Sequence, residues 1–87
     1  MLHSPKEVKN ISHPMVEKAY IKREVMPNGQ EGDDNVLVLK LRDFNTYASR
    51  TSRRDAYIDF LISLSEIKKE VQKKAGSFTR IDIQSHH

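Results

Sequence analysis

The residues of this chain that could do chemistry gather in the segment 46–54, which reads Thr-Tyr-Ala-Ser-Arg-Thr-Ser-Arg-Arg. It holds three arginines and no acidic residue. A guanidinium group can bind two phosphate oxygens at once, and a serine or threonine hydroxyl can donate a further hydrogen bond. The segment therefore predicts a phosphate-binding loop. Its candidate contacts are Ser49, Arg50, Thr51, Ser52, Arg53 and Arg54.

One aromatic residue and four further cations extend this prediction from phosphate to nucleic acid. The ring of Tyr47 could stack on an unpaired base, and Lys22, Arg23, Lys40 and Arg42 could flank the loop. The loop also leads into a predicted helix, whose N-terminus adds partial positive charge. The whole chain has 15 Lys and Arg against 12 Asp and Glu, a formal net charge of +3. We therefore predict a small, basic regulatory protein that binds DNA or RNA.

A second function fits the same sequence, a non-enzymatic module that binds or inhibits another protein, of the small phage-like regulator kind. Such a module would use the exposed half of the long helix, the acidic loop 30–35 or an open sheet edge. Acidic and basic residues are segregated along the chain, which suits either function. The partner is therefore predicted to be a nucleic acid or a protein.

Other kinds of chemistry find little support. The sequence contains no Gly-x-Ser-x-Gly elbow, phosphate loop or dinucleotide motif, so we expect no enzyme, no catalytic residue and no cofactor. The chain has no cysteine, which excludes disulfides and thiolate metal sites. Its four histidines share no metal-binding spacing, and no metal site is predicted. The histidines are His3, His13, His86 and His87.

The size of the chain limits how these residues can be positioned. Its 87 residues predict a single domain over 1–87, with loose termini at 1–4 and 85–87. No stretch approaches the roughly 20 apolar residues of a membrane span, and the start lacks a signal-peptide core, so we expect a cytoplasmic protein without a membrane partner. A domain this small without a disulfide is marginally stable, which favours the hypothesis of a homodimer.

A long helix over 53–75 is the clearest predicted element. Ser52 and Asp55 resemble a capping box, and Gly76 suits the position just past a helix end. The apolar residues recur at alternating spacings of three and four, as on one side of a helix. They are Tyr57, Phe60, Leu64, Ile67 and Val71, and the first half adds Ile58, Leu61 and Ile62. The first half is therefore expected to bury a broad side against a sheet, and the lysine-flanked second half to keep a narrow seam.

Alternating residues predict three strands, at about 15–26, 36–42 and 78–84. The turn Pro27-Asn28-Gly29 joins the first two into an antiparallel hairpin. Ser4-Pro5-Lys6-Glu7 reads as a capping box and predicts a short helix at about 5–11. The predicted fold is α+β, a small, mostly antiparallel three-stranded sheet packed by one long helix. The direction of the last strand relative to the second is left open by the sequence.

Overall fold

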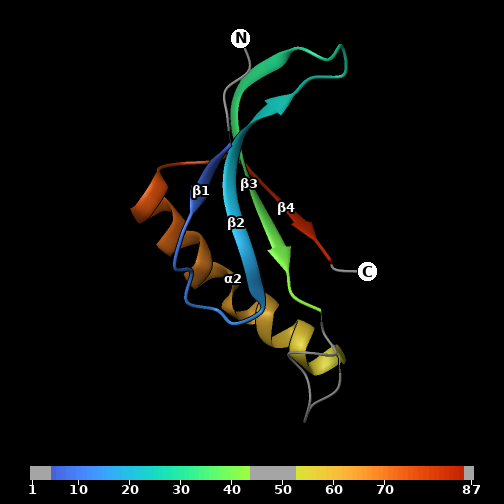
Figure 1. Ribbon diagram of the computed structural model, residues 1–87, viewed down its shortest axis with the longest axis vertical. Coiled ribbons are helices and arrows are strands. Elements are labelled where there is room, and N and C mark those ends of the chain that lie inside the picture. Colours follow the sequence, from blue (N-terminus) through green and yellow to red (C-terminus); the bar gives the residue numbers. More distant parts are fainter. Residues whose placement is uncertain (1–4, 44–52, 86–87) are drawn as a thin grey trace.

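The computed structural model describes residues 5–43 and 53–85, which form one mixed four-stranded sheet and one long helix (Figure 1). The elements in chain order are β1 (Lys6–Val8), β2 (Val16–Val25), β3 (Glu31–Leu41), α2 (Arg53–Ala75) and β4 (Arg80–Gln84). The strands lie in the order β1-β2-β3-β4. The first two pairs are antiparallel, and β3 pairs with β4 in parallel. The predicted α+β class is confirmed.

The hairpin of β2 and β3 forms at the predicted turn. The Gly29 N–H donates to the Met26 carbonyl, and the Met26 N–H donates to the Gln30 carbonyl, both at 2.8 Å. Gly29 has φ +83°, a conformation that a residue with a Cβ adopts at a cost. β3 begins at Glu31, earlier than predicted, because its polar start pairs with the end of β2 across a register shift. The predicted loop therefore shortens to a tight turn.

The helix α2 connects β3 to β4 and confirms the predicted bounds of 53–75. Gly76, with φ +98°, ends it, and the Gly76 N–H donates to the Gln72 carbonyl at 3.1 Å. The chain then returns beside β3, where the Thr79 N–H donates to the Asn35 carbonyl at 2.9 Å. Figure 1 shows α2 behind the sheet and β4 beside β3, a right-handed crossover. The last strand is thus parallel to its neighbour.

The prediction of a short helix at 5–11 is wrong. Lys6–Val8 is the strand β1, which pairs with β2 so that Val8 lies opposite Ala19. A helix of one or two turns cannot hold itself together in water. A strand at the sheet edge forms hydrogen bonds with β2, and Val8 is buried there, 5% exposed. The sheet consequently has four strands instead of three.

The core lies between α2 and the face of the sheet that α2 covers. Among the described residues, no polar or charged side chain is buried in it. From the sheet it contains Val8, Ala19, Ile21, Leu37, Leu39 and Leu41, and from α2 it contains Phe60, Ile67 and Val71.

The expected broad buried side of the first half of α2 is a second wrong prediction. Ile58, Leu61 and Ile62 are 41%, 42% and 74% exposed. Successive residues turn by about 100° around a helix, so Ile58 and Ile62 lie roughly opposite Phe60 and Ile67, and Leu61 lies on the flank between the two sides. A single helix on a sheet can bury only one side, and the side through Phe60 and Ile67 is the buried one. The second half keeps the expected narrow seam, with Ile67 and Val71 buried, whereas the first half, among its described side chains, buries only Ala56 and Phe60.

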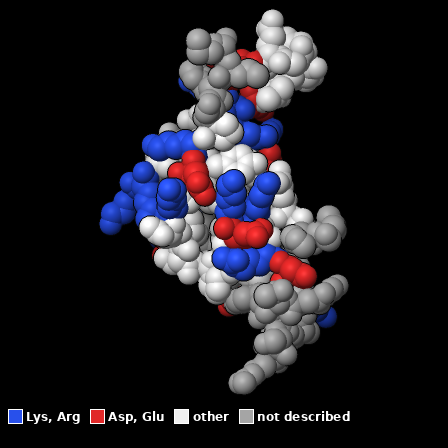
Figure 2. All heavy atoms as spheres, viewed as in Figure 1, with Lys and Arg blue, Asp and Glu red and all other residues white. Residues whose placement is uncertain are grey.

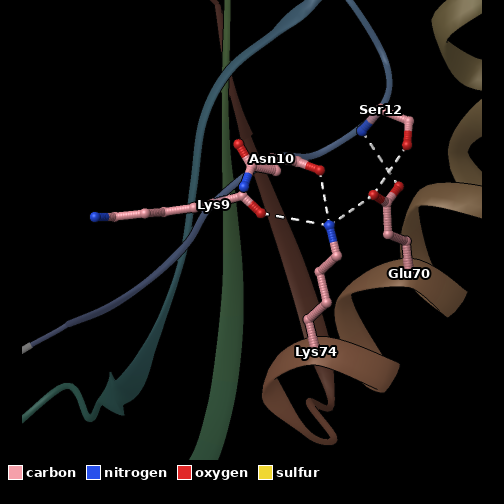
Figure 3. A network of polar contacts seen from close by, with 5 residues as sticks. All are labelled: Lys9, Asn10, Ser12, Glu70 and Lys74. Carbon is pink, nitrogen blue, oxygen red and sulfur yellow. Dashed lines mark hydrogen bonds and ion pairs between the residues drawn. The ribbon is translucent and has the colours of Figure 1, made fainter.

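A polar network ties the connection between β1 and β2 to the end of α2 (Figure 3). Lys74 Nζ donates to the carbonyls of Asn10 at 2.7 Å and Lys9 at 3.4 Å, and to Glu70 Oε1 at 3.0 Å. The Ser12 N–H and hydroxyl both donate to the Glu70 carboxylate. Asn10 has φ +62°, a left-handed conformation that asparagine tolerates. The network holds β1 in place at the sheet edge.

The same network sets the charge state of Glu70. Burial, the largest single influence, raises the pKa of this carboxyl group. The hydrogen bonds from Lys74 and Ser12, together with the positive charge of Lys74, outweigh burial and lower the pKa below its usual range. Glu70 is therefore a carboxylate at neutral pH.

Within residues 5–43 and 53–85, no helix combines the length and the apolar character that crossing a membrane requires.

Candidate nucleic-acid interface

Most of the predicted phosphate-binding loop lies outside the described residues. This holds for Tyr47, Ser49, Arg50, Thr51 and Ser52. Arg53 is the first residue of α2, and Arg54 is exposed in its first turn. The loop therefore stays a prediction from the sequence.

Of the four predicted flanking cations, two arginines have structural partners. Arg23 donates to the Asp33 carbonyl at 2.8 Å, and its Nε lies 4.0 Å from Glu31 Oε1. Both contacts lie within the hairpin of β2 and β3. Arg42 Nε donates to the Pro14 carbonyl at 3.0 Å, where the chain enters β2. These two guanidinium groups therefore stabilise the hairpin of β2 and β3 and the start of β2.

The other two flanking cations, Lys22 and Lys40, lie on the face of the sheet that α2 leaves uncovered. Side chains alternate between the two faces of a strand, and ladder partners share a face. Since Leu39 and Leu41 point into the core, Lys40 between them points away from it. Lys22 lies opposite Val36, whose neighbour Leu37 is also in the core. We call this uncovered side the open face.

The middle of the open face is a row of four residues that crosses all four strands, with an aromatic and an apolar residue between two carboxylates. The register places Glu7, Tyr20, Val38 and Asp82 side by side, from β1 to β4. Tyr20 is half-buried, whereas Val38 is fully buried although no helix covers it. Tyr20 thus keeps part of its side chain open to solvent on this face.

Cationic rows flank this middle row on both sides. On one side Lys18 lies directly opposite Lys40, and on the other Lys22 and Arg80 lie across Val36. None of the three lysines forms an ion pair or hydrogen bond with another residue that the structure describes. Arg80, in contrast, contacts Glu24 at 3.0 Å and Asp82 at 3.5 Å. The uncompensated positive charge of the open face therefore belongs to the lysines.

Two adjoining hollows lie beside these lysines. An open pocket of about 300 Å³ is lined by Pro5, Glu7, Lys18, Tyr20 and Lys40. A second hollow, of about 360 Å³, shares Glu7 and Lys18 and continues past the end of β1 to Arg42. Figure 2 shows the open face, where blue Lys and Arg side chains alternate with red Asp and Glu around white surface. The face can therefore receive a flat, anionic molecule beside the Tyr20 ring.

Sequence reasoning missed Lys18 and Tyr20 as candidate contacts. The signal for them is the run Lys18-x-Tyr20-x-Lys22, in which one strand carries an aromatic ring between two cations on one face. This signal becomes specific only when the face that holds it is known to be uncovered, which depends on where α2 packs.

Metal binding has no geometric support in the described ranges. Among those residues, no group of three or more His, Asp or Glu side chains could hold a metal ion.

No protein-family model matches the chain, and no curated protein or solved structure is significantly similar to it. Its function is therefore inferred from the geometry of the open face.

Proposed function

We propose that this protein binds a single-stranded segment of nucleic acid across the open face of its sheet. The Tyr20 ring stacks on a base, and Lys18, Lys22 and Lys40 contact phosphates. The observation that carries the proposal is the pair Lys18 and Lys40, which lie directly opposite each other beside the half-buried ring of Tyr20.

The lysine pair favours an anionic ligand because like charges directly opposite each other on a sheet destabilise it. A phosphate between the two ammonium groups turns this repulsion into attraction. The rows of the open face hold four cations and two acids, Glu7 and Asp82, and Arg80 contacts both Asp82 and the neighbouring Glu24. Four cations thus lie near three acids. An incoming phosphate therefore meets a net positive surface.

The aromatic ring and the shape of the face favour a single strand over a duplex. Bases of single strands stack on exposed aromatic rings of a sheet, and such stacking contributes about 1–3 kcal/mol per base. Reading a DNA duplex requires an element that enters a groove. Among the described residues no helix projects from the open face, and the hollow beside Lys18, Tyr20 and Lys40 suits a strand lying flat.

The arginine segment 46–54 forms the second part of this proposal. In sequence it begins six residues after Lys40 and runs into the first turn of α2, where Arg54 is exposed. We assign it additional phosphate contacts along the same strand of nucleic acid. It supplies charge, whereas Tyr20 supplies the preference for unpaired bases.

Fluorescence anisotropy with labelled single-stranded DNA, single-stranded RNA and duplex DNA, at two salt concentrations, tests the proposal. We expect tighter binding of single strands and a steep loss of affinity with salt. Tyr20→Leu should weaken binding about 5- to 150-fold, the equivalent of one stacked base. Lys40→Gln should reduce the salt slope by about one, as expected for one lost phosphate contact.

The matched control is Lys73→Gln, which removes the same charge from an exposed position near the end of α2. This variant should bind like the unmodified protein. If Lys73→Gln and Lys40→Gln weaken binding equally, only net charge matters and the open face is not the site. If no nucleic acid binds at all, the alternative of a protein-binding module takes the place of this proposal.

A further inference from the structure

The side of α2 that points away from the sheet is apolar in its first half. Ile58, Leu61 and Ile62 are 41%, 42% and 74% exposed, and Ser65 continues the same side one turn further. The described part of the fold has two layers, with α2 forming the second layer alone (Figure 1). Contiguous apolar patches on a protein surface often mark the site where a binding partner packs.

We infer that this surface binds a second copy of the same chain, with the two α2 helices antiparallel and a twofold axis passing at Ile62. The outward side of α2 carries Asp55, Ile62 and Lys69 at intervals of seven residues. Residues seven apart lie on one side of a helix, as in a coiled-coil seam. Ile62, the most exposed large apolar residue of the described chain, is the middle one.

The charges at the two ends select the antiparallel arrangement. A twofold axis at Ile62 places Asp55 of one copy against Lys69 of the other, which also lies 3.6 Å from Glu66 of its own helix. The symmetry repeats this contact at the opposite end. A parallel pair would place Asp55 against Asp55 and Lys69 against Lys69. Antiparallel packing also sets the positive end of each helix dipole against the negative end of the other. Opposite charges therefore meet only in the antiparallel dimer.

The size of the surface indicates a dimer that dissociates on dilution. Stable complexes bury about 800 Å² on each partner, and a contact between two short helix segments is at or below that size. The three isoleucine and leucine side chains form its centre, and the polar residues around them form the rim. In such a dimer the helices lie inside and both open faces point outward, so dimerisation does not depend on the proposed nucleic-acid binding.

Sedimentation equilibrium of the full chain between about 5 and 500 μM tests the dimer. We expect the average mass to rise toward two chains, and Ile62→Glu to keep the protein monomeric over the whole range. The matched control is Val25→Glu, which places the same charge on a residue that is 60% exposed at the hairpin, and it should dimerise like the unmodified chain. A monomeric unmodified chain at the highest concentration, or a dimeric Ile62→Glu variant, overturns the inference.

Cross-linking and a charge exchange test the register. The chain has no cysteine, so Ile62→Cys introduces a single thiol, which on the twofold axis meets its own symmetry mate. This variant should form a disulfide dimer at least tenfold faster than Val25→Cys under mild oxidation.

A charge exchange tests the same register. Lys69→Asp should weaken the dimer severalfold, and adding Asp55→Lys should restore it. Equal cross-linking rates, or a double variant as weak as Lys69→Asp alone, exclude the antiparallel register.

Discussion

Lys18 and Lys40 lie directly opposite each other on the sheet, an arrangement that destabilises the fold but favours binding of an anion. Like charges directly opposite each other cost stability, whereas an opposite-charge pair in the same positions contributes about 0.2–1 kcal/mol. Lys40→Glu should therefore raise the free energy of unfolding by about 0.5 kcal/mol and at the same time abolish the phosphate contact. Urea unfolding and anisotropy on the same preparation measure both effects.

The control for this prediction is Lys22→Glu on the same face. Lys22 lies opposite Val36, so its reversal relieves no repulsion across the strand pair. We expect this variant to lose binding without gaining stability. A stability gain in Lys22→Glu equal to that in Lys40→Glu would show that the lysine pair itself is not strained.

At the scale of elements, β1 is held by contacts that come from far along the chain. Glu70 and Lys74 of α2 bind the backbone around Asn10 and Ser12 (Figure 3). β1 supplies Glu7 to the open face and lines one wall of its pocket. The shape of the candidate site therefore depends on a polar network on the other side of the sheet edge.

The lowered pKa of Glu70 makes the contribution of this network dependent on pH. Because the folded pKa lies below the unfolded one, the stabilisation is complete above the ordinary glutamate pKa of about 4.3 and is lost as the pH falls through the lower folded value. Glu70→Gln should reduce the free energy of unfolding by about 1 kcal/mol at pH 7, less than the ~1.5–3 kcal/mol of a hydrogen bond to a charged group because solvent reaches the Lys74 and Glu70 side chains. Denaturant unfolding between about pH 3 and 7 should show this difference shrinking toward acid pH.

Glu66→Gln provides the comparison for Glu70. Glu66 lies 3.6 Å from Lys69, but both side chains are about three-quarters exposed, and such surface pairs contribute little. This variant should change stability by a few tenths of a kcal/mol at any pH. A pH-independent effect of Glu70→Gln would mean that the carboxylate charge is not what holds β1.

The elements that could be predicted from the sequence are those specified by local periodicity. The 3-4 spacing through Phe60, Ile67 and Val71 predicts α2, and the alternation through Leu37 and Leu39 predicts β3. The segment 5–11 could not be predicted in this way, because a local capping signal competes there with pairing to β2. Val8 pairs with Ala19 of a distant segment, and a strand of three residues is too short to show the alternation of apolar and polar residues that would predict such pairing.

The candidate site could be predicted only in part for a related reason. The positive charge of Lys22 and Lys40 is enough to predict them as candidate contacts. Lys18 and Tyr20 become candidates only once the packing of α2 shows which face of the sheet is uncovered. Likewise, an apolar stripe that is wider than one side of a helix does not say which residues turn inward. Ile58 and Ile62 are as apolar as Ile67, yet only Ile67 meets the sheet.

At the scale of the whole molecule, a two-layer fold of 87 residues has a small core, and burial of the outer side of α2 in a dimer would add to it. A partner that binds only the folded state stabilises it by mass action, by about 1.4 kcal/mol at ten times its Kd. For a domain of this size, 1 kcal/mol shifts the Tm by about 4–8 °C. The Tm should consequently rise by about 5 °C between about 10 and 500 μM protein.

Ile62→Glu should remove this dependence of the Tm on concentration while Val25→Glu retains it, since only Ile62 lies on the outer side of α2. Scanning calorimetry at both concentrations measures the shift, and a Tm that is independent of concentration in the unmodified chain would show that the folded monomer is stable without a second copy.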